Sequence, residues 1–152
     1  MPLLLAILFI PIIQIQQVFV KQTGLQAAHE AARYYAINSP TNPDINAVIT
    51  QSRQVATQNI DPFLNTKPLY YNPNLDVQFS EIDYGPDNTY CRGTVVIHAP
   101  VSIPWIGKLL GRPAEAEPAA NWNSFNNPMG RNAGSEYVMD IPASGFFKKE
   151  VP

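Results

Sequence analysis

The sequence predicts an α+β protein shaped like a lollipop, with a long N-terminal helix and a small head in which one amphipathic helix packs on an antiparallel sheet. Met1 to Val20 carries no charged side chain, and an alanine-rich segment without proline follows from Lys21 to Ile37. Beyond it, one segment has helical periodicity, and others alternate apolar with polar residues or form β-branched runs, as strands do. The length of 152 residues suits one small unit, which we divide into a polymerisation helix (1–37) and a head (38–152).

The apolar N-terminus is the strongest signal in the chain. Met1 to Ile13 is apolar throughout. At about 1.5 Å per residue this run covers roughly 20 Å of the ~30 Å hydrocarbon core of a bilayer. Three interpretations follow: a cleaved signal peptide, an ordinary membrane anchor, and a helix that leaves the bilayer to pack inside an assembly. The signal peptide is the least favoured, because no Lys or Arg precedes Lys21 and the next small residues lie within a helical pattern.

The helix is expected to continue to Ile37 and to end at Asn38-Ser39-Pro40. Pro11 lacks a backbone N–H, so we expect a kink or local unwinding between Ala6 and Ile12. Small side chains recur every fourth residue and form one nearly axial row, which favours close contact with a helix of another subunit, although alanine is also simply the best helix former. The row comprises Gly24, Ala28, Ala32 and Ala36, and Leu5, Phe9 and Ile13 are expected to extend the subunit-packing surface into the apolar segment.

The second helix of the prediction opens the head. Asn42-Pro43-Asp44 reads as an N-cap, a first-position proline and a first-turn acid. Apolar residues then follow helical spacing from Ile45 to Ile60, and Asp61-Pro62 is expected to end the helix. The opposite face is polar, so this helix should cover an apolar surface.

That surface is predicted to be a small antiparallel sheet. Leu75 to Phe79 alternates apolar with polar residues, and Thr94 to Ala99 is β-branched, with turn residues at Gly85-Pro86-Asp87-Asn88 between them. Tyr137 to Ile141 is predicted as a third or fourth strand, and Asn121 to Ser135 as an exposed loop. Because the head has its own alternating apolar positions, deletion of residues 1–24 is expected to leave it soluble and folded.

No combination of side chains predicts an enzyme, a metal site or a cofactor. His29 and His98 are far apart in the sequence, and neither has a partner at a metal-ligand spacing. Cys91 is not expected to reach His98 as a thiol–imidazole pair, so we predict a surface histidine and an inert thiol.

Composition and charge narrow the class of function further. The chain has 10 Lys and Arg against 12 Asp and Glu, a net charge of −2, and no basic cluster larger than Lys148-Lys149. This balance argues against nucleic acid as a partner. Glu30 and Arg33 are one helical turn apart and are expected to form a local ion pair or a polar contact between subunits.

The N-terminal third of the chain carries a family resemblance. An apolar run starts at Pro2 and leads, through glutamine-rich residues, into a helix whose core reads Ala28-His-Glu-Ala-Ala-Arg-Tyr-Tyr-Ala36. This order resembles the TadE-like pilins of tight-adherence pilus systems, in which an apolar segment near a proline precedes an A-x-E-A-A-R-x-A helix. Here one extra residue stands before the last alanine. The resemblance covers about residues 2 to 105, including the two predicted strands and Pro104.

The resemblance implies a type IV pilin-like structural subunit without enzymatic activity. Such a subunit is anchored in the inner membrane by its N-terminal helix, is polymerised by a pilus export machinery into an extracellular helical filament, and serves surface attachment. Two alternatives are a minor pilin at the filament tip or base, and a membrane-anchored extracytoplasmic binding module that does not polymerise. Family members usually carry a leader peptide and an early glutamate, whereas no acid precedes Glu30 here. The chain is therefore either a mature form or a divergent branch that packs without that glutamate.

Overall fold

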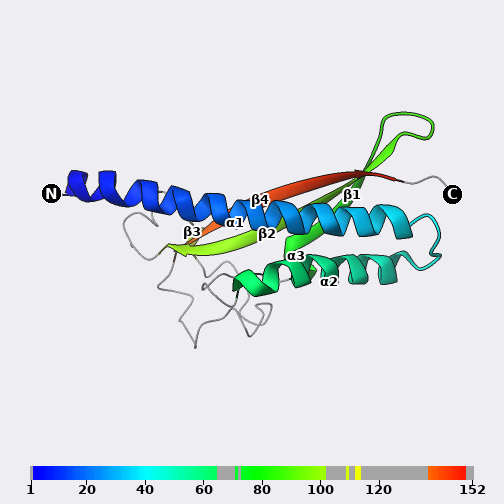
Figure 1. The fold of residues 1–152 in the computed structure, drawn as a ribbon, viewed down its shortest axis with the longest axis horizontal. Helices are drawn as coiled ribbons and strands as arrows, with labels where there is room; N and C mark the ends of the chain where they lie inside the picture. Colours follow the sequence, from blue (N-terminus) through cyan, green and yellow to red (C-terminus); the bar gives the residue numbers. More distant parts are fainter. Residues whose placement is uncertain are drawn as a thin grey trace.

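The predicted fold class is confirmed by a computed structural model, which describes residues 2–64, 71, 73–101, 109, 112–113 and 137–149. The helix α1 (Pro2–Asn38) runs along the length of the molecule, and α2 (Ile45–Leu64) lies beside its C-terminal half. A four-stranded antiparallel sheet packs against the same half of α1, while the N-terminal end of α1 projects beyond the sheet (Figure 1). The predicted loop from Asn121 to Ser135 lies outside the described residues.

The sheet has the order β1-β2-β4-β3. Its strands are β1 (Val77–Asp83), β2 (Thr89–Val101), β3 (Arg112–Pro113) and β4 (Tyr137–Lys148). Strands β1 and β2 form a hairpin around the predicted turn. There Gly85 and Asp87 adopt positive φ angles of 126° and 59°, and the N–H of Asn88 donates to the carbonyl of Gly85 at 3.1 Å. Both β2 and β4 are longer than predicted. The helical turn α3 (Pro73–Asp76) replaces the first residues of the predicted strand from Leu75 to Phe79.

The ends of α2 differ from the prediction. Asp44, rather than Asn42, is the N-cap, because its Oδ1 accepts the N–H of Ala47 at 3.2 Å. Asn42 Oδ1 accepts the N–H of Asp44 at 3.0 Å and so shapes the turn that precedes the cap. At the other end, α2 continues through Pro62 to Leu64, because a proline within the last turn removes only one helical hydrogen bond.

The predicted break in α1 at Pro11 is wrong. Pro11 lies inside α1, which is helical throughout from Pro2 to Asn38 and follows one gentle curve in Figure 1. The missing N–H of one proline costs a single backbone hydrogen bond, and the turns on either side keep theirs. The stretch from Ala6 to Ile12 is therefore helical.

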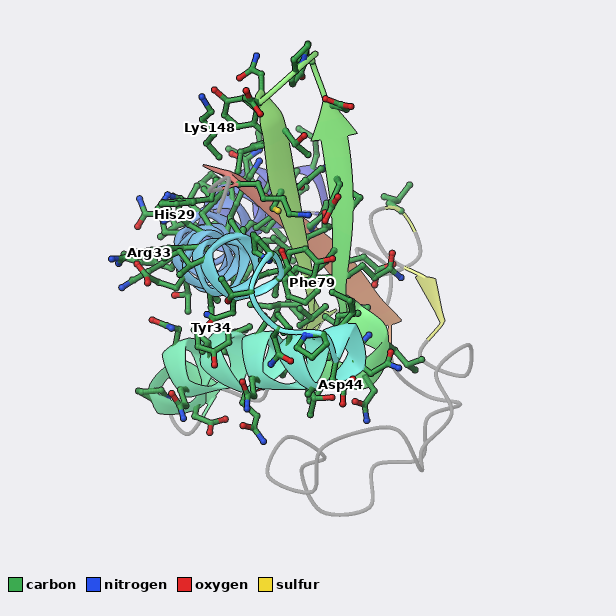
Figure 2. All side chains as sticks on the ribbon, turned by 90° about the vertical axis from the view of Figure 1, so that its right-hand side faces the viewer. His29, Arg33, Tyr34, Asp44, Phe79 and Lys148 are labelled. Carbon is green, nitrogen blue, oxygen red and sulfur yellow. The ribbon has the colours of Figure 1, made fainter. Side chains whose placement is uncertain are left out.

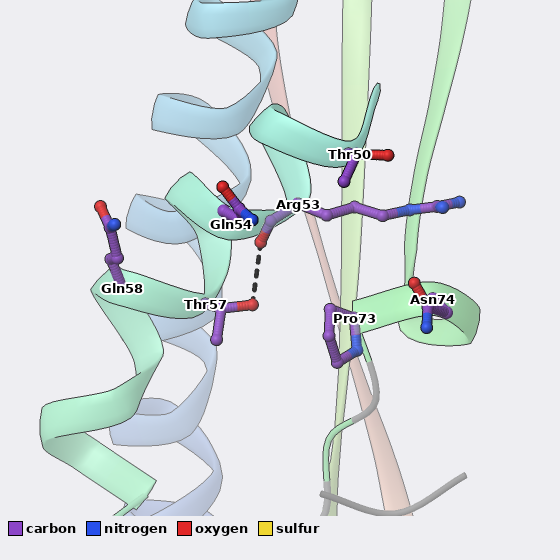
Figure 3. A pocket seen from close by; sticks show the side chains of 7 residues that line it. All are labelled: Thr50, Arg53, Gln54, Thr57, Gln58, Pro73 and Asn74. Atoms are coloured by element: carbon purple, nitrogen blue, oxygen red, sulfur yellow. Dashed lines mark hydrogen bonds between the residues drawn. The ribbon is translucent and has the colours of Figure 1, made fainter. Parts of the chain in front are cut away.

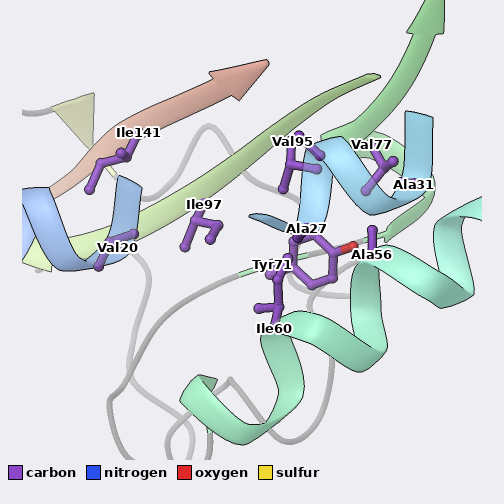
Figure 4. Close-up of a cluster of buried hydrophobic side chains, with 11 residues drawn as sticks. Val20, Ala27, Ala31, Ala56, Ile60, Tyr71, Val77, Val95, Ile97 and Ile141 are labelled. Carbon is purple, nitrogen blue, oxygen red and sulfur yellow. The ribbon is translucent and has the colours of Figure 1, made fainter. Parts of the chain in front are cut away.

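The core of the head includes the C-terminal half of α1, so the predicted boundary between residues 37 and 38 is wrong. Val20 is 2% exposed, and from Ala27 onward α1 contributes fully buried alanines. Figure 4 shows how these side chains meet those of α2 and the sheet. This cluster contains Val20, Ala27, Ala28, Ala31, Ala56, Ile60, Tyr71, Val77, Val95, Ile97 and Ile141. A second cluster joins Tyr35 and Ala36 to Val48 and Cys91.

The burial of Val20 changes the expected result of N-terminal truncation. Deletion of residues 1–16 should leave the head folded, because the buried residues of α1 begin at Val20. Deletion of residues 1–24 also removes Val20 and Gly24, and should lower the free energy of unfolding by about 2 kcal/mol relative to the shorter deletion. Urea unfolding of the two truncated proteins measures the difference, and equal stabilities would contradict the inclusion of Val20 in the core.

Candidate functional site

The first candidate site is the apolar stub, which we define as residues 3–19 of α1. Ten of its large apolar side chains are exposed, among them Leu3 at 73% and Phe19 at 52%. An 18-residue window of α1 has a mean hydropathy of 2.3 with 6% of it buried within the chain, so α1 is long and apolar enough to cross a membrane by length and composition. Of the predicted packing residues, Leu5 is exposed, and Phe9 and Ile13 are half-buried.

The predicted row of small residues does not lie on a free surface. Ala28, Ala32 and Ala36 are fully buried within the chain. A Cβ atom added to Gly24 would lie 3.1 Å from the Cβ of Ala143 on β4. The row therefore packs against the sheet of its own head, and its assignment as a contact between subunits is wrong.

The partner of this row is a pair of glycines that sequence reasoning missed. Gly93 on β2 and Gly145 on β4 are directly opposite each other in the sheet, and we call them the glycine saddle. A Cβ atom on Gly93 would lie 2.9 Å from the carbonyl oxygen of Ala28 and 3.2 Å from the Cβ of Ala32. A Cβ atom on Gly145 would overlap the backbone of His29. The backbone of α1 thus rests directly on the sheet, which is a common reason for glycine within a strand.

Glu30 and Arg33 form the predicted local pair. Arg33 Nη1 lies 3.7 Å from Glu30 Oε2, and both side chains are substantially exposed, at 54% and 39%. Arg33 points away from the sheet (Figure 2), whereas the His29 ring lies edge-on to the ring of Phe147 on β4, with 5.9 Å between their centroids. An ion pair of this exposure contributes little to stability, so these charges lie on the outer face of α1, where a contact between subunits remains a prediction.

The second candidate site is a buried ionisable cluster that connects α3, β2 and β4. His98 is 4% exposed, and its Nε2 lies 2.9 Å from Asp76 Oδ1. Its Nδ1 lies 2.5 Å from the Oδ1 of Asp140, the residue opposite it on β4. Burial opposes a charge on the ring, but the hydrogen bonds and negative charges of Asp76 and then Asp140 outweigh this and raise the pKa of His98. His98, which was predicted to lie on the surface, is therefore buried and forms a hydrogen bond through each ring nitrogen.

This arrangement suits a structural role better than a catalytic one. A protonated imidazole donates from both ring nitrogens, and here both nitrogens face carboxylates. No ring nitrogen is then left to act as a general base or to bind a metal ion. Within the described part of the chain, no group of three or more His, Cys, Asp and Glu side chains is arranged to hold a metal ion.

Cys91 lies on the other face of the sheet from His98. The two residues are seven positions apart on β2, and alternate residues of a strand face opposite sides. Cys91 is fully buried, and burial, followed by the charge of Glu81, raises the pKa of its thiol to about 11. A thiol with this pKa is protonated near neutral pH and unreactive.

A polar groove between α2 and α3 is the third candidate. Figure 3 shows the side chains that line this groove, whose volume is about 540 Å³. Arg53 extends from α2 across the groove, and its Nε donates to the carbonyl of Val77 at 3.3 Å. Thr57 Oγ1 donates to the carbonyl of Arg53 at 2.8 Å. The described lining consists of Thr50, Arg53, Gln54, Thr57, Gln58, Pro73 and Asn74.

Amide, hydroxyl and guanidinium groups of this kind can hydrogen-bond a small polar ligand. Among the described lining residues of the groove, none is a carboxylate that could act as an acid or base. Comparisons with family models, with curated proteins and with solved structures found no match for this chain.

Proposed function

We propose that the protein is a structural subunit of an extracellular filament of the tight-adherence pilus type, anchored in the inner membrane through α1 before assembly. The observation that carries this proposal is the continuity of α1. One uninterrupted helix begins as an exposed apolar stub and ends as the central helix of the head. Because α1 is continuous, it holds the head at a fixed position relative to the membrane or the neighbouring chains that surround the stub.

The stub needs an apolar environment. Contiguous exposed apolar surface is rare on monomeric soluble proteins and marks contacts with membranes or other chains. Leaving a large aliphatic side chain fully exposed costs about 1.5–3 kcal/mol of free energy relative to burying it. A bilayer and the interior of a filament both supply the missing burial, which fits a subunit that moves from one to the other. The exposed side chains are Leu3, Leu4, Leu5, Ile7, Leu8, Ile10, Ile12, Ile15, Val18 and Phe19.

Apolar packing between subunits is assigned to the stub. Since the row from Gly24 to Ala36 is occupied by the glycine saddle of its own head, it is not available to a neighbouring chain. Leu5, Phe9 and Ile13 are four residues apart on one face of α1 and remain our proposed contacts. Glu30 and Arg33 are the proposed polar contacts, because they lie exposed on the outer face.

The head supplies the outer surface of the filament and any adhesive contact, and we assign it no enzymatic activity. The filament assembles through a pilus export machinery, and a minor pilin at the tip or base would have the same architecture. The polar groove between α2 and α3 favours a second candidate, a membrane-anchored extracytoplasmic binding module that does not polymerise.

Replacing Phe9 with asparagine distinguishes the filament subunit from the binding module that does not polymerise. The substitution places an amide in the proposed contact between stubs, and should lower the yield of filaments by at least about ten-fold, the effect of roughly 1.4 kcal/mol per contact. Membrane association should persist, because the other apolar residues of the stub remain. Filaments sheared from cells are counted by electron microscopy, and the chain in membranes is measured by immunoblotting.

Asp87→Asn is the matched control, because it changes an exposed turn at positive φ to a residue that tolerates this conformation. Filaments from the control but not from Phe9→Asn support the proposal. A wild-type chain found in membranes without filaments would support the binding module instead. A wild-type chain found in neither would overturn both candidates.

A further inference from the structure

A cavity lies where the apolar stub joins the head. Its volume is about 450 Å³. One wall is a single face of α1, at the spacing i, i+3, i+4 and i+7, and the other is the start of β4. Four of the described lining residues are polar or charged, and three are apolar. The residues are Gln14, Gln17, Val18 and Lys21 of α1, and Asp140, Ile141 and Pro142 of β4.

The end of the apolar run places this cavity at the surface of a membrane. Ile13 is the last residue of the unbroken apolar run, and the polar residues Gln14 and Gln17 that follow it both line the cavity. The head already touches α1 at Gln17, whose Nε2 donates to the sulfur of Met139 at 3.1 Å, so α1 cannot sink deeper without the head. Polar and charged residues that flank the apolar part of a membrane helix lie in the headgroup region. Lys21 is the first charged residue of the chain and marks that level.

We propose that this cavity binds a phospholipid headgroup that carries both a phosphate and a primary ammonium, as in phosphatidylethanolamine. The Lys21 ammonium donates to the phosphate, and the Asp140 carboxylate accepts from the headgroup ammonium. The amides of Gln14 and Gln17 flank the phosphate, and Val18 and Pro142 face the start of the acyl chains. The inference rests on the membrane anchoring in the proposed function.

The two opposite charges in the cavity determine which headgroup fits. Choline carries no N–H to donate to Asp140, and sites for quaternary ammonium groups use aromatic rings, of which the described lining has none. Phosphatidylglycerol offers Lys21 a phosphate but offers Asp140 no cation. The Asp140 side chain is 40% exposed while its Oδ1 faces His98, and a carboxylate accepts several hydrogen bonds, so the headgroup adds to the contact with His98.

Lipid retention by the full chain tests this inference. The chain is purified in detergent, mixed with equal amounts of phosphatidylethanolamine, phosphatidylcholine and phosphatidylglycerol, and the bound lipid is identified by native mass spectrometry. Phosphatidylethanolamine should be retained preferentially. Lys21→Gln should lower its retention about five-fold, the factor expected for one lysine at a membrane surface. Lys148→Gln is the matched control, because Lys148 is exposed at the far end of β4 and should have no effect.

Two further experiments distinguish lipid binding from simple anion binding and from membrane anchoring. Millimolar inorganic phosphate should not displace the lipid, and displacement would show a simple anion site instead. Flotation with phosphatidylcholine vesicles, with and without phosphatidylethanolamine, tests anchoring separately. A chain that floats with both but retains the three lipids equally, or is insensitive to Lys21→Gln, overturns this inference and leaves anchoring intact. A chain that floats with neither overturns the anchoring, and this inference with it.

Discussion

Replacing Gly145 with alanine is expected to lower the free energy of unfolding of the head by about 3 kcal/mol or more. The new Cβ atom would overlap backbone atoms of His29 and approach the carbonyl carbon of Ala28 to 2.7 Å. Backbone atoms inside a helix cannot rotate away as the end of a flexible side chain can. The variant must therefore lift α1 from the sheet and loosen the contacts on both sides of the glycine saddle.

Urea unfolding of the full chain in a mild detergent measures this effect. Lys148→Ala is the matched control, since Lys148 is exposed on the same strand, and a surface change of this kind should stay within about 0.5 kcal/mol. If Gly145→Ala and the control are equally stable, α1 does not rest on the saddle as described.

Replacing His98 with leucine is expected to cost about 3–5 kcal/mol at pH 6, because it leaves the buried Asp76 carboxylate without its imidazole partner. The pKa of His98 is raised in the folded chain, so its contribution is fully present below the ordinary histidine pKa of about 6.5 and is lost as the pH rises through the folded-state pKa. The wild type should therefore lose stability as the pH increases above about 6.5. The difference between wild type and variant should shrink over the same range.

Unfolding free energies at a series of pH values provide this measurement. His29→Leu is the control, because the His29 side chain is 52% exposed and takes no part in the His98 cluster, so the loss of stability that comes from His98 should persist in this variant. A gap between wild type and His98→Leu that stays constant with pH would show that His98 is not held as an imidazolium.

The sequence predicted the elements that are encoded locally. The long proline-poor helix, the amphipathic segment from Ile45 and the strand around Thr94 each carry their own periodicity, and the structure contains all of them. The first turn of α2 was displaced by two residues, because Asn42 and Asp44 are both good capping residues and only the hydrogen bonds distinguish them. Strand β4 was predicted too short, since Pro142 interrupts its pattern.

The partner of the small-residue row could not be read from its spacing. Small side chains at every fourth position permit close approach to any backbone, whether of a helix in another subunit or of a glycine-lined sheet in the same chain. A glycine inside a strand would have separated the two, because it marks a close backbone contact, but Gly93 directly precedes the predicted run from Thr94 to Ala99. Its partner Gly145 lay beyond the predicted strand, so their pairing was not visible.

The His98 cluster could not be predicted from local sequence patterns either. Its three members are separated by 22 and 42 residues. Asp140 faces His98 only through the register of β2 and β4, and Asp76 only through the turn α3, which was predicted as strand. A register has to be known before such a cross-strand pair can be recognised.

The central claim is that α1 serves two environments, with residues from Val20 onward packed in its own head and the stub packed against other chains. An electron cryomicroscopy reconstruction of filaments from cells that express the chain tests it most directly. The account predicts stubs in contact with one another at the filament axis, with Gly24, Ala28 and Ala32 of each subunit against its own β2 and β4. A filament in which this row contacts α1 of a neighbouring subunit would contradict it.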